Sequence, residues 1–195
     1  MHIAYIHGAT ASSRSFAFIQ SQLNSSRVIS LDYDRDAPAL NNLKTMEDTL
    51  SSILDDIYII GHSLGGLYAI YLQSKNKNII GVCSLSTPFN GSEIATWSSM
   101  LLPHYQLFQD ITPNSNFILN TKSININIPW TQFVTTEGGV PWLVGDNDGI
   151  VTKSSMTARD DVDYILVDRN HYEILQSQRV VDFLTHTTHK GGQDG

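Results

Sequence analysis

Short apolar runs alternate with longer amphipathic stretches along most of the chain. The runs are four to seven residues long and end at glycine or polar residues, which is typical of strands buried in a parallel sheet. Between the runs, hydrophobic residues recur at helical spacing. The pattern predicts strands at residues 3–6, 28–31, 57–60, 79–85, 132–136 and 164–167.

Alternating strands and helices predict an α/β protein, with a mostly parallel sheet of about six strands and helices on both faces. Crossovers between parallel strands are expected to be right-handed. The expected helices carry Phe16, Ile19 and Leu23; Leu43, Met46, Leu50 and Leu54; Leu67, Ile70 and Tyr71; and Ile174, Val180, Val181 and Leu184.

Residues 87–128 interrupt this alternation. They include three prolines and an apolar middle that we expect to be partly helical. Their end, residues 124–128, alternates with a period of two and predicts a half-exposed strand or an extended segment. We interpret the stretch as a short cap or lid-like insertion in a single domain of residues 1–195, whose last part, residues 185–195, is expected to be a flexible tail.

Length and charge limit the classes of partner. The 195 residues fit one domain, and the formal net charge is −7 without a cluster of basic residues. Binding to nucleic acid requires Lys and Arg gathered on one face, so nucleic acid is not an expected partner, and anionic membrane surfaces are disfavoured for the same reason. The sequence leaves the oligomeric state open.

Neither a disulfide nor a membrane segment is expected. Cys83 is the one cysteine and lies in the apolar run 79–85, which predicts a buried strand residue. No run approaches the ~20 apolar residues of a transmembrane helix. Residues 1–6 enter a strand-like run without the basic start of a signal peptide. We therefore expect a cytoplasmic protein without stable membrane insertion.

A serine stands where the third predicted strand meets the next helix. Gly61-His62-Ser63-Leu64-Gly65 is a G-x-S-x-G sequence, and its strand-to-helix setting gives the motif physical meaning. Small residues permit a sharp turn that lifts the serine hydroxyl above the sheet edge and directs the next amide toward the same space. The helix N-terminus favours a developing oxyanion there. The alternative is a glycine-rich turn without chemistry.

A nucleophilic serine requires a base, and His171 is the best placed of seven histidines. It follows the last predicted strand, at the sheet edge where α/β proteins bind their ligands. The alternative is a histidine that merely caps the last helix, whereas His62 is expected to pack. An acid must hold the base in the correct tautomer. Asp146 and Asp148 both follow the fifth strand, and Glu137 is a more remote candidate.

Together these motifs resemble those of α/β hydrolases, and within them small bacterial lipases and carboxylesterases. They extend over nearly the whole chain in the family's order. The strands that precede the His-Gly strand in larger members are missing, so the resemblance implies a minimal α/β-hydrolase fold with a small cap. The matching segments are Tyr5-Ile6-His7-Gly8-Ala9, residues 61–66 and 86–92, Asn147-Asp148-Gly149-Ile150-Val151, and Asn170-His171-Tyr172-Glu173.

The resemblance implies a Ser-His-Asp triad. The chain order Ser63, Asp148, His171 is the order that α/β hydrolases use. The family's Asp-Gly-hydrophobic-Val piece selects Asp148 over Asp146. Such a triad requires no metal and no cofactor.

The resemblance also implies an oxyanion hole of two backbone N–H donors. These are the amide of Leu64 and that of Ala9, the residue after the His-Gly pair. The apolar middle of the insertion holds more hydrophobic residues than a surface loop needs. Trp97, Leu101 and Leu102 are therefore candidates for a substrate-binding pocket, and packing on the core is an equal alternative.

The expected function is hydrolysis of a small-molecule ester or lipid through an acyl-enzyme on Ser63. The same triad would serve a thioesterase, an amidase, an acyltransferase or a polyester depolymerase. A ligand receptor that keeps the triad is the non-enzymatic alternative. The sequence does not select the natural substrate or its acyl chain length.

Overall fold

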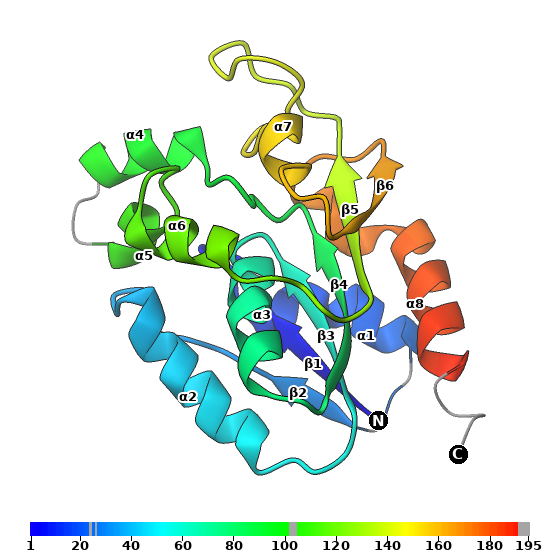
Figure 1. The fold of residues 1–195 in the computed structure, drawn as a ribbon. Helices are drawn as coiled ribbons and strands as arrows, with labels where there is room; N and C mark the ends of the chain where they lie inside the picture. Colours follow the sequence, from blue (N-terminus) through cyan, green and yellow to red (C-terminus); the bar gives the residue numbers. More distant parts are fainter. Residues whose placement is uncertain (24, 26, 102–104, 191–195) are drawn as a thin grey trace.

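A computed structural model describes residues 1–23, 25, 27–101 and 105–190, without the side chains of residues 97, 99–101, 189 and 190. Within these residues one sheet of six parallel strands runs through the centre of the molecule (Figure 1). Its order is β2-β1-β3-β4-β5-β6. The strands are β1 (His2–Ile6), β2 (Val28–Ser30), β3 (Ile57–His62), β4 (Ile79–Leu85), β5 (Trp130–Thr135) and β6 (Asp163–Val167).

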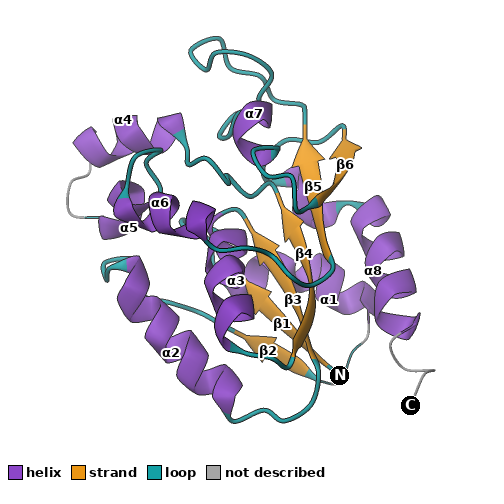
Figure 2. Ribbon diagram, in the orientation of Figure 1, coloured by secondary structure: helices purple, strands orange, loops and turns teal. Residues whose placement is uncertain are grey.

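Helices cover both faces of the sheet (Figure 2). On one face α1 packs against α8, and on the other α2 packs against α3. The helices α4 to α6 and α7 lie in the segments that follow β4 and β5. The helical elements are η1 (Ser13–Phe16), α1 (Ala17–Leu23), α2 (Ala39–Ser51), α3 (Leu64–Lys75), α4 (Glu93–Leu101), α5 (Gln106–Asp110), α6 (Asn116–Ser123), α7 (Lys153–Met156), η2 (Glu173–Gln176) and α8 (Gln178–Lys190).

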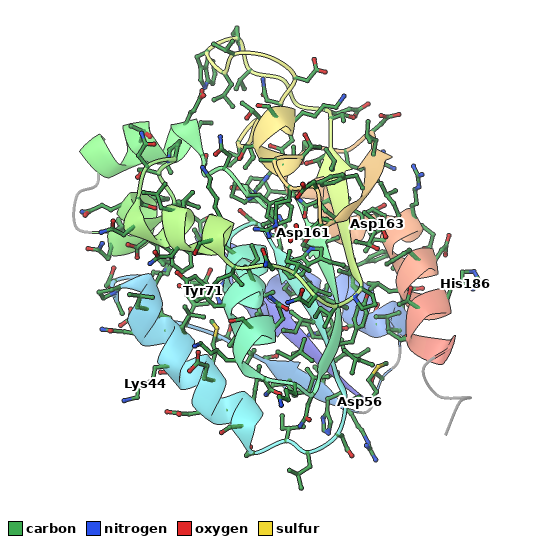
Figure 3. The ribbon with its side chains drawn as sticks, in the orientation of Figure 1. Lys44, Asp56, Tyr71, Asp161, Asp163 and His186 are labelled. Carbon is green, nitrogen blue, oxygen red and sulfur yellow. The ribbon has the colours of Figure 1, made fainter. Side chains whose placement is uncertain are left out.

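The two-residue period of the strands divides the core between the faces. In β1, Ile3 and Tyr5 join the cluster under α1 and α8, whereas Ala4 and Ile6 join the cluster under α2 and α3. Complete burial of each large apolar side chain contributes about 1.5–3 kcal/mol. Charged and polar side chains on the outer faces of the helices point away from the sheet, as Figure 3 shows for Lys44 on α2 and His186 on α8. The prediction that Cys83 is buried is confirmed.

The order of the strands creates a crevice at the carboxyl ends of β1 and β3. After β1 the chain forms β2 on one side and then returns to form β3 on the other. The loops that leave β1 and β3 therefore diverge, and in open α/β sheets ligands bind at such a switch point. The predicted serine turn follows β3 and the predicted oxyanion loop follows β1, so the topology brings both to one place.

Three details differ from the expectations. Leu54 is 90% exposed, because α2 ends at Ser51 and the chain must turn before β3. Residues 124–128 belong to no strand: Ile124 and Ile128 lie in bends, and the segment connects α6 to β5. Residues 185–190, expected in the tail, continue α8, and residues 191–195 lie outside the described part. The described helices are all too short or too polar to span a bilayer.

Candidate active site

Ser63 occupies a strained turn between β3 and α3. Its φ of 52° and ψ of −118° are unfavourable for a residue with a side chain. The Ser63 N–H donates to the carbonyl of Leu85 at 2.8 Å, which anchors the turn to the neighbouring strand. Gly65 permits the close approach, because a Cβ there would lie 2.0 Å from the carbonyl oxygen of Ile6. The N–H of Leu64, the first residue of α3, has no acceptor within the helix.

Asp148 and His171 form a buried pair. The Nδ1 of His171 lies 2.8 Å from Oδ2 of Asp148, and the two residues are 3% and 1% exposed. Because an ionised carboxylate can only accept, the imidazole carries its proton on Nδ1 when neutral. Its Nε2 then holds a free lone pair. This is the tautomer in which a histidine can remove a proton from a serine hydroxyl.

The surroundings of Asp148 favour its charged form. Burial raises the pKa of this carboxyl, but hydrogen bonds from His171, Thr135 and the Val151 N–H, together with the charge of His171, outweigh burial and hold the pKa below its ordinary value. The backbone N–H groups of Ile150 and Val151 both donate to Oδ1, at 3.0 and 2.8 Å. The backbone of the turn that follows Asp148 therefore holds the carboxylate in position.

The other two acid candidates lie elsewhere. Asp146 is exposed and its carboxylate lies 3.7 Å from the ammonium group of Lys153. Glu137 is exposed, and its backbone N–H pairs with the carbonyl of Arg169. Of the three carboxylates, Asp148 is the one that the structure brings to His171.

Ser63, His171 and Ala9 line one cavity of about 220 Å³. Apolar side chains from α4, α5 and the segment after Asp148 form much of its wall. The cavity is lined by Gly8, Ala9, Thr10, Ala11, His62, Ser63, Pro88, Ser92, Ile94, Ala95, Ser98, Phe108, Ile111, Ile150, Val151, His171 and Tyr172.

The loop after β1 presents the amide of Ala9. The carbonyl of Gly8 accepts from Nδ1 of His7 at 2.8 Å and from the Ala11 N–H at 3.1 Å. In a trans peptide the following N–H points opposite to that carbonyl. Two donors that fix the carbonyl of Gly8 therefore also fix the direction of the Ala9 N–H.

His7 is itself held from two sides. Its ring stacks on Tyr33 with centroids 4.1 Å apart, and its Nε2 lies 3.2 Å from Oδ1 of Asp32. Burial lowers the pKa of His7, partly offset by the Gly8 carbonyl and Asp32. His7 supports the loop by donating its Nδ1 proton to the Gly8 carbonyl, and its Nε2 can donate to Asp32 only when the ring carries a second proton.

His62 links the serine turn to the loop of the base, a contact that the sequence did not reveal. Its Nε2 lies 2.8 Å from the backbone carbonyl of His171, so Nε2 carries a proton and donates. Burial, followed by the charge of His171, lowers the pKa of His62 to about 3. A neutral, 1% exposed ring thus holds the main chain of the base. The adjacency of His62 to Ser63 was the one available signal.

The predicted substrate-binding residues lie outside what the structure describes. This holds for Leu102 and for the side chains of Trp97 and Leu101, although the backbone of the last two belongs to α4. Among the described side chains of the same segment, those of Ile94 and Ala95 from α4 and Phe108 from α5 line the cavity.

Comparison with known proteins identifies the class. Residues 3–121, more than half of the chain, match the model of the alpha/beta hydrolase family. The chain therefore belongs to this family, and the predicted minimal α/β-hydrolase fold is confirmed. No curated protein matches the chain.

Solved structures of similar fold include lipases and esterases. The mature lipase BlEst2 of Bacillus licheniformis has a TM-score of 0.71 at 16% identity, over 95% of this chain and 91% of that one. The chain spans 49% of the propeptide form of the same lipase. The metagenomic carboxyl esterase MGS0156 has a TM-score of 0.74 at 10% identity, over 100% and 76% of the two chains. Identities this low establish likeness of fold alone.

Proposed function

We propose that this α/β-hydrolase is a serine esterase that cleaves carboxylic esters through Ser63. The observation that carries the proposal is the buried Asp148–His171 pair, because its His171 lines the same cavity as Ser63 and Ala9. The chemistry of an acyl transfer needs a nucleophile, a base with a free Nε2 and two oxyanion donors at one place. The lipase and carboxyl esterase among the similar folds support an ester as the substrate.

In the first step, Nε2 of His171 takes the proton of the Ser63 hydroxyl as its oxygen attacks the ester carbonyl. The N–H groups of Leu64 and Ala9 receive the negative charge that develops on the carbonyl oxygen. Collapse of the tetrahedral intermediate releases the alcohol, which takes the proton from His171. Asp148 stabilises the imidazolium in between.

In the second step, water attacks the acyl-enzyme. His171 takes one proton of this water, and the second tetrahedral intermediate expels the Ser63 oxygen, which recovers that proton. The products are the carboxylic acid and the free enzyme. The steps require no metal and no cofactor.

The size of the cavity favours short acyl groups. Its volume of about 220 Å³ is below the 300–1,000 Å³ that is usual for pockets of drug-sized ligands. Phe108 and Ile111 of the segment 87–128 stand in its wall, so we propose that this segment acts as a small cap within a single catalytic domain. Esters with long acyl chains would extend beyond the cavity.

A series of p-nitrophenyl esters with acyl chains from two to about twelve carbons tests the proposal. We expect the highest kcat/KM at the short end, and a loss of about 10⁴-fold or more in Ser63→Ala. Ser74→Ala is the control, because this exposed serine lies at the far end of α3. Undiminished rates in Ser63→Ala would refute the assignment. Thioester and amide analogues of the same substrates test whether the protein is a thioesterase or an amidase. Binding of a ligand without turnover would indicate a receptor.

A further inference from the structure

Two buried hydroxyl groups extend from Asp148 into the end of the sheet. Thr135 is the last residue of β5, and Ser86 directly follows β4; both are fully buried. The Oγ1 of Thr135 donates to Oδ2 of Asp148. The Oγ of Ser86 lies 2.9 Å from Oγ1 of Thr135.

The direction of each hydrogen bond follows from the acceptors. An ionised carboxylate has no proton to give, so Thr135 is the donor to Asp148. The sulfur of Met156 lies 3.5 Å from the same hydroxyl but is a weaker acceptor than a charged oxygen. Since the hydroxyl of Thr135 donates its one proton to Asp148, the hydroxyl of Ser86 must donate to Thr135.

Thr135 completes the set of donors around the carboxylate. Oδ1 accepts from the backbone N–H groups of Ile150 and Val151, and Oδ2 accepts from Nδ1 of His171 and from Thr135. Four donors occupy the four sites that a carboxylate offers. The carboxylate cannot rotate about its bond to Cβ without loss of several of these contacts.

Ser86, the last residue in this row of hydrogen-bonded side chains, has a strained backbone conformation. Among the described residues, the non-glycine residues with positive φ are Ser63, at 52°, and Ser86, at 53°. The Ser86 N–H donates to the carbonyl of Phe133 at 3.0 Å, and this conformation turns its hydroxyl toward Thr135. Residues in such conformations persist where the surroundings fix them, and they cluster at functional sites.

We propose that Thr135, oriented by Ser86, is a positioning residue that sets the direction and the charge of the Asp148 oxygen facing His171. The proposal rests on the proposed function, because it assigns Thr135 a role through the pair that serves Ser63. By sharing Oδ2 with His171, the hydroxyl draws negative charge away from the contact with the imidazole. Loss of the Thr135 hydroxyl would leave more negative charge on Oδ2 of Asp148, and this oxygen would then stabilise the imidazolium more strongly.

A purely structural role predicts a different outcome. If Thr135 only filled space at the end of β5, replacement by the isosteric valine would alter stability but would not change the pH dependence of the reaction. If its loss merely loosened Asp148, the imidazolium would lose support, and the acid limb of kcat/KM would move to lower pH. The proposed role moves this limb to higher pH.

Three variants separate these outcomes. Thr135→Val removes the hydroxyl, and Thr135→Ser restores it. Thr121→Val is the matched control, since Thr121 is 1% exposed and donates only to the helical carbonyl of Ile118. The other ionisable groups around His171 stay in place in all three: the ring of His62 from β3, centred 4.9 Å away, the neighbouring Tyr172 at 5.4 Å, and His7, which acts on His62.

With a short p-nitrophenyl ester, we expect Thr135→Val to lower kcat about 10-fold, with little change in KM, and to move the acid limb upward. Thr135→Ser restores both values, and Thr121→Val changes neither. An acid limb that stays in place or moves to lower pH in Thr135→Val, or a failure of serine to restore it, overturns the proposal. If Thr135→Val does not fold, Ser86→Ala, which removes the donor to Thr135, is expected to shift the limb in the same direction by less, and an unmoved limb there overturns the proposal.

A second measurement does not depend on turnover. The proton between Nδ1 of His171 and Asp148 gives a downfield NMR resonance, which we expect to move in Thr135→Val and to stay in Thr121→Val. If the wild-type protein hydrolyses no ester, the proposed function fails, and this resonance alone still decides the role of Thr135. An unchanged resonance in Thr135→Val counts against it.

Discussion

His62 makes the stability of the protein depend on pH in a way that can be measured. Its ring is 1% exposed and donates from Nε2 to the carbonyl of His171, so the folded state requires the neutral form. The change to test is His62→Gln. The glutamine amide can still donate to this carbonyl, but it does not titrate.

The magnitude follows from the difference between the folded and unfolded states. Burial lowers the pKa of His62 from 6.5 to about 3 in the folded protein. The unfolded chain therefore binds a proton that the folded protein rejects, and stability is lost as the pH falls below 6.5. Each pH unit costs about 1.4 kcal/mol in this window, so acidification from about pH 7.5 to about pH 4.5 costs roughly 2.5 kcal/mol.

Urea denaturation at these two pH values measures the free energy of unfolding. We expect His62→Gln to lose roughly 2–3 kcal/mol less than the wild type on acidification. The lowered pKa of Asp148 also reduces stability in acid, but it does so equally in both proteins. His186→Gln is the control, since His186 is exposed on α8. Equal losses in wild type and His62→Gln would show that the buried His62 is not the source of this loss in acid.

Three further predictions concern the oxyanion loop, the acid and the cap. In Gly8→Ala the new Cβ would lie 3.0 Å from Nδ1 of His62, so we expect a lower kcat in a folded protein, seen by ester kinetics with circular dichroism. Asp148→Asn should lower kcat about 10⁴-fold with little change in fold, because the amide favours the wrong tautomer of His171. Arg159 donates to two carbonyls at the end of α6, so Arg159→Ala should cost about 2 kcal/mol of stability, measured with urea.

Each of these predictions has its own control. Gly139→Ala is the control for Gly8→Ala, because a Cβ at Gly139 would meet only the carbonyl oxygen of Asn147, at 4.0 Å. Asp146→Asn should leave kcat near the wild-type value, and a loss equal to that of Asp148→Asn would contradict the choice of acid. Arg159→Lys should recover part of the stability, and full stability of Arg159→Ala would show that the two carbonyls do not need this donor.

Much of the fold was accessible from the sequence because its strands are short, apolar and buried on both faces. The run 79–85 matches β4 at both ends, and its residues pack on both faces of the sheet: Val82 in the cluster under α2 and α3, Cys83 and Leu85 in the cluster under α1 and α8. Element ends were less accessible. Leu54 continues the helical spacing of α2, yet the chain needs those residues to turn into β3, which spacing alone does not reveal.

In the candidate site, the proposed catalytic residues could be predicted from the sequence, but the contacts that support them could not. Ser63, Asp148 and His171 stand in local motifs at strand ends, and parallel topology gathers such ends at one edge. The supporting contacts arise between residues far apart in the chain. Neither the bond from His62 to the His171 carbonyl nor the one from Thr135 to Asp148 leaves a local pattern, because each depends on how two loops meet.

Covalent labelling shows directly whether Ser63 is a nucleophile that His171 activates. A fluorophosphonate reacts with a serine whose hydroxyl is deprotonated by a neighbouring base, and mass spectrometry of the digested protein locates the adduct. We predict a single adduct on Ser63, absent in Ser63→Ala and formed at least about 100-fold more slowly in His171→Ala. An adduct on another residue would rule out Ser63 as the nucleophile, and equal labelling of wild type and His171→Ala would rule out His171 as its base.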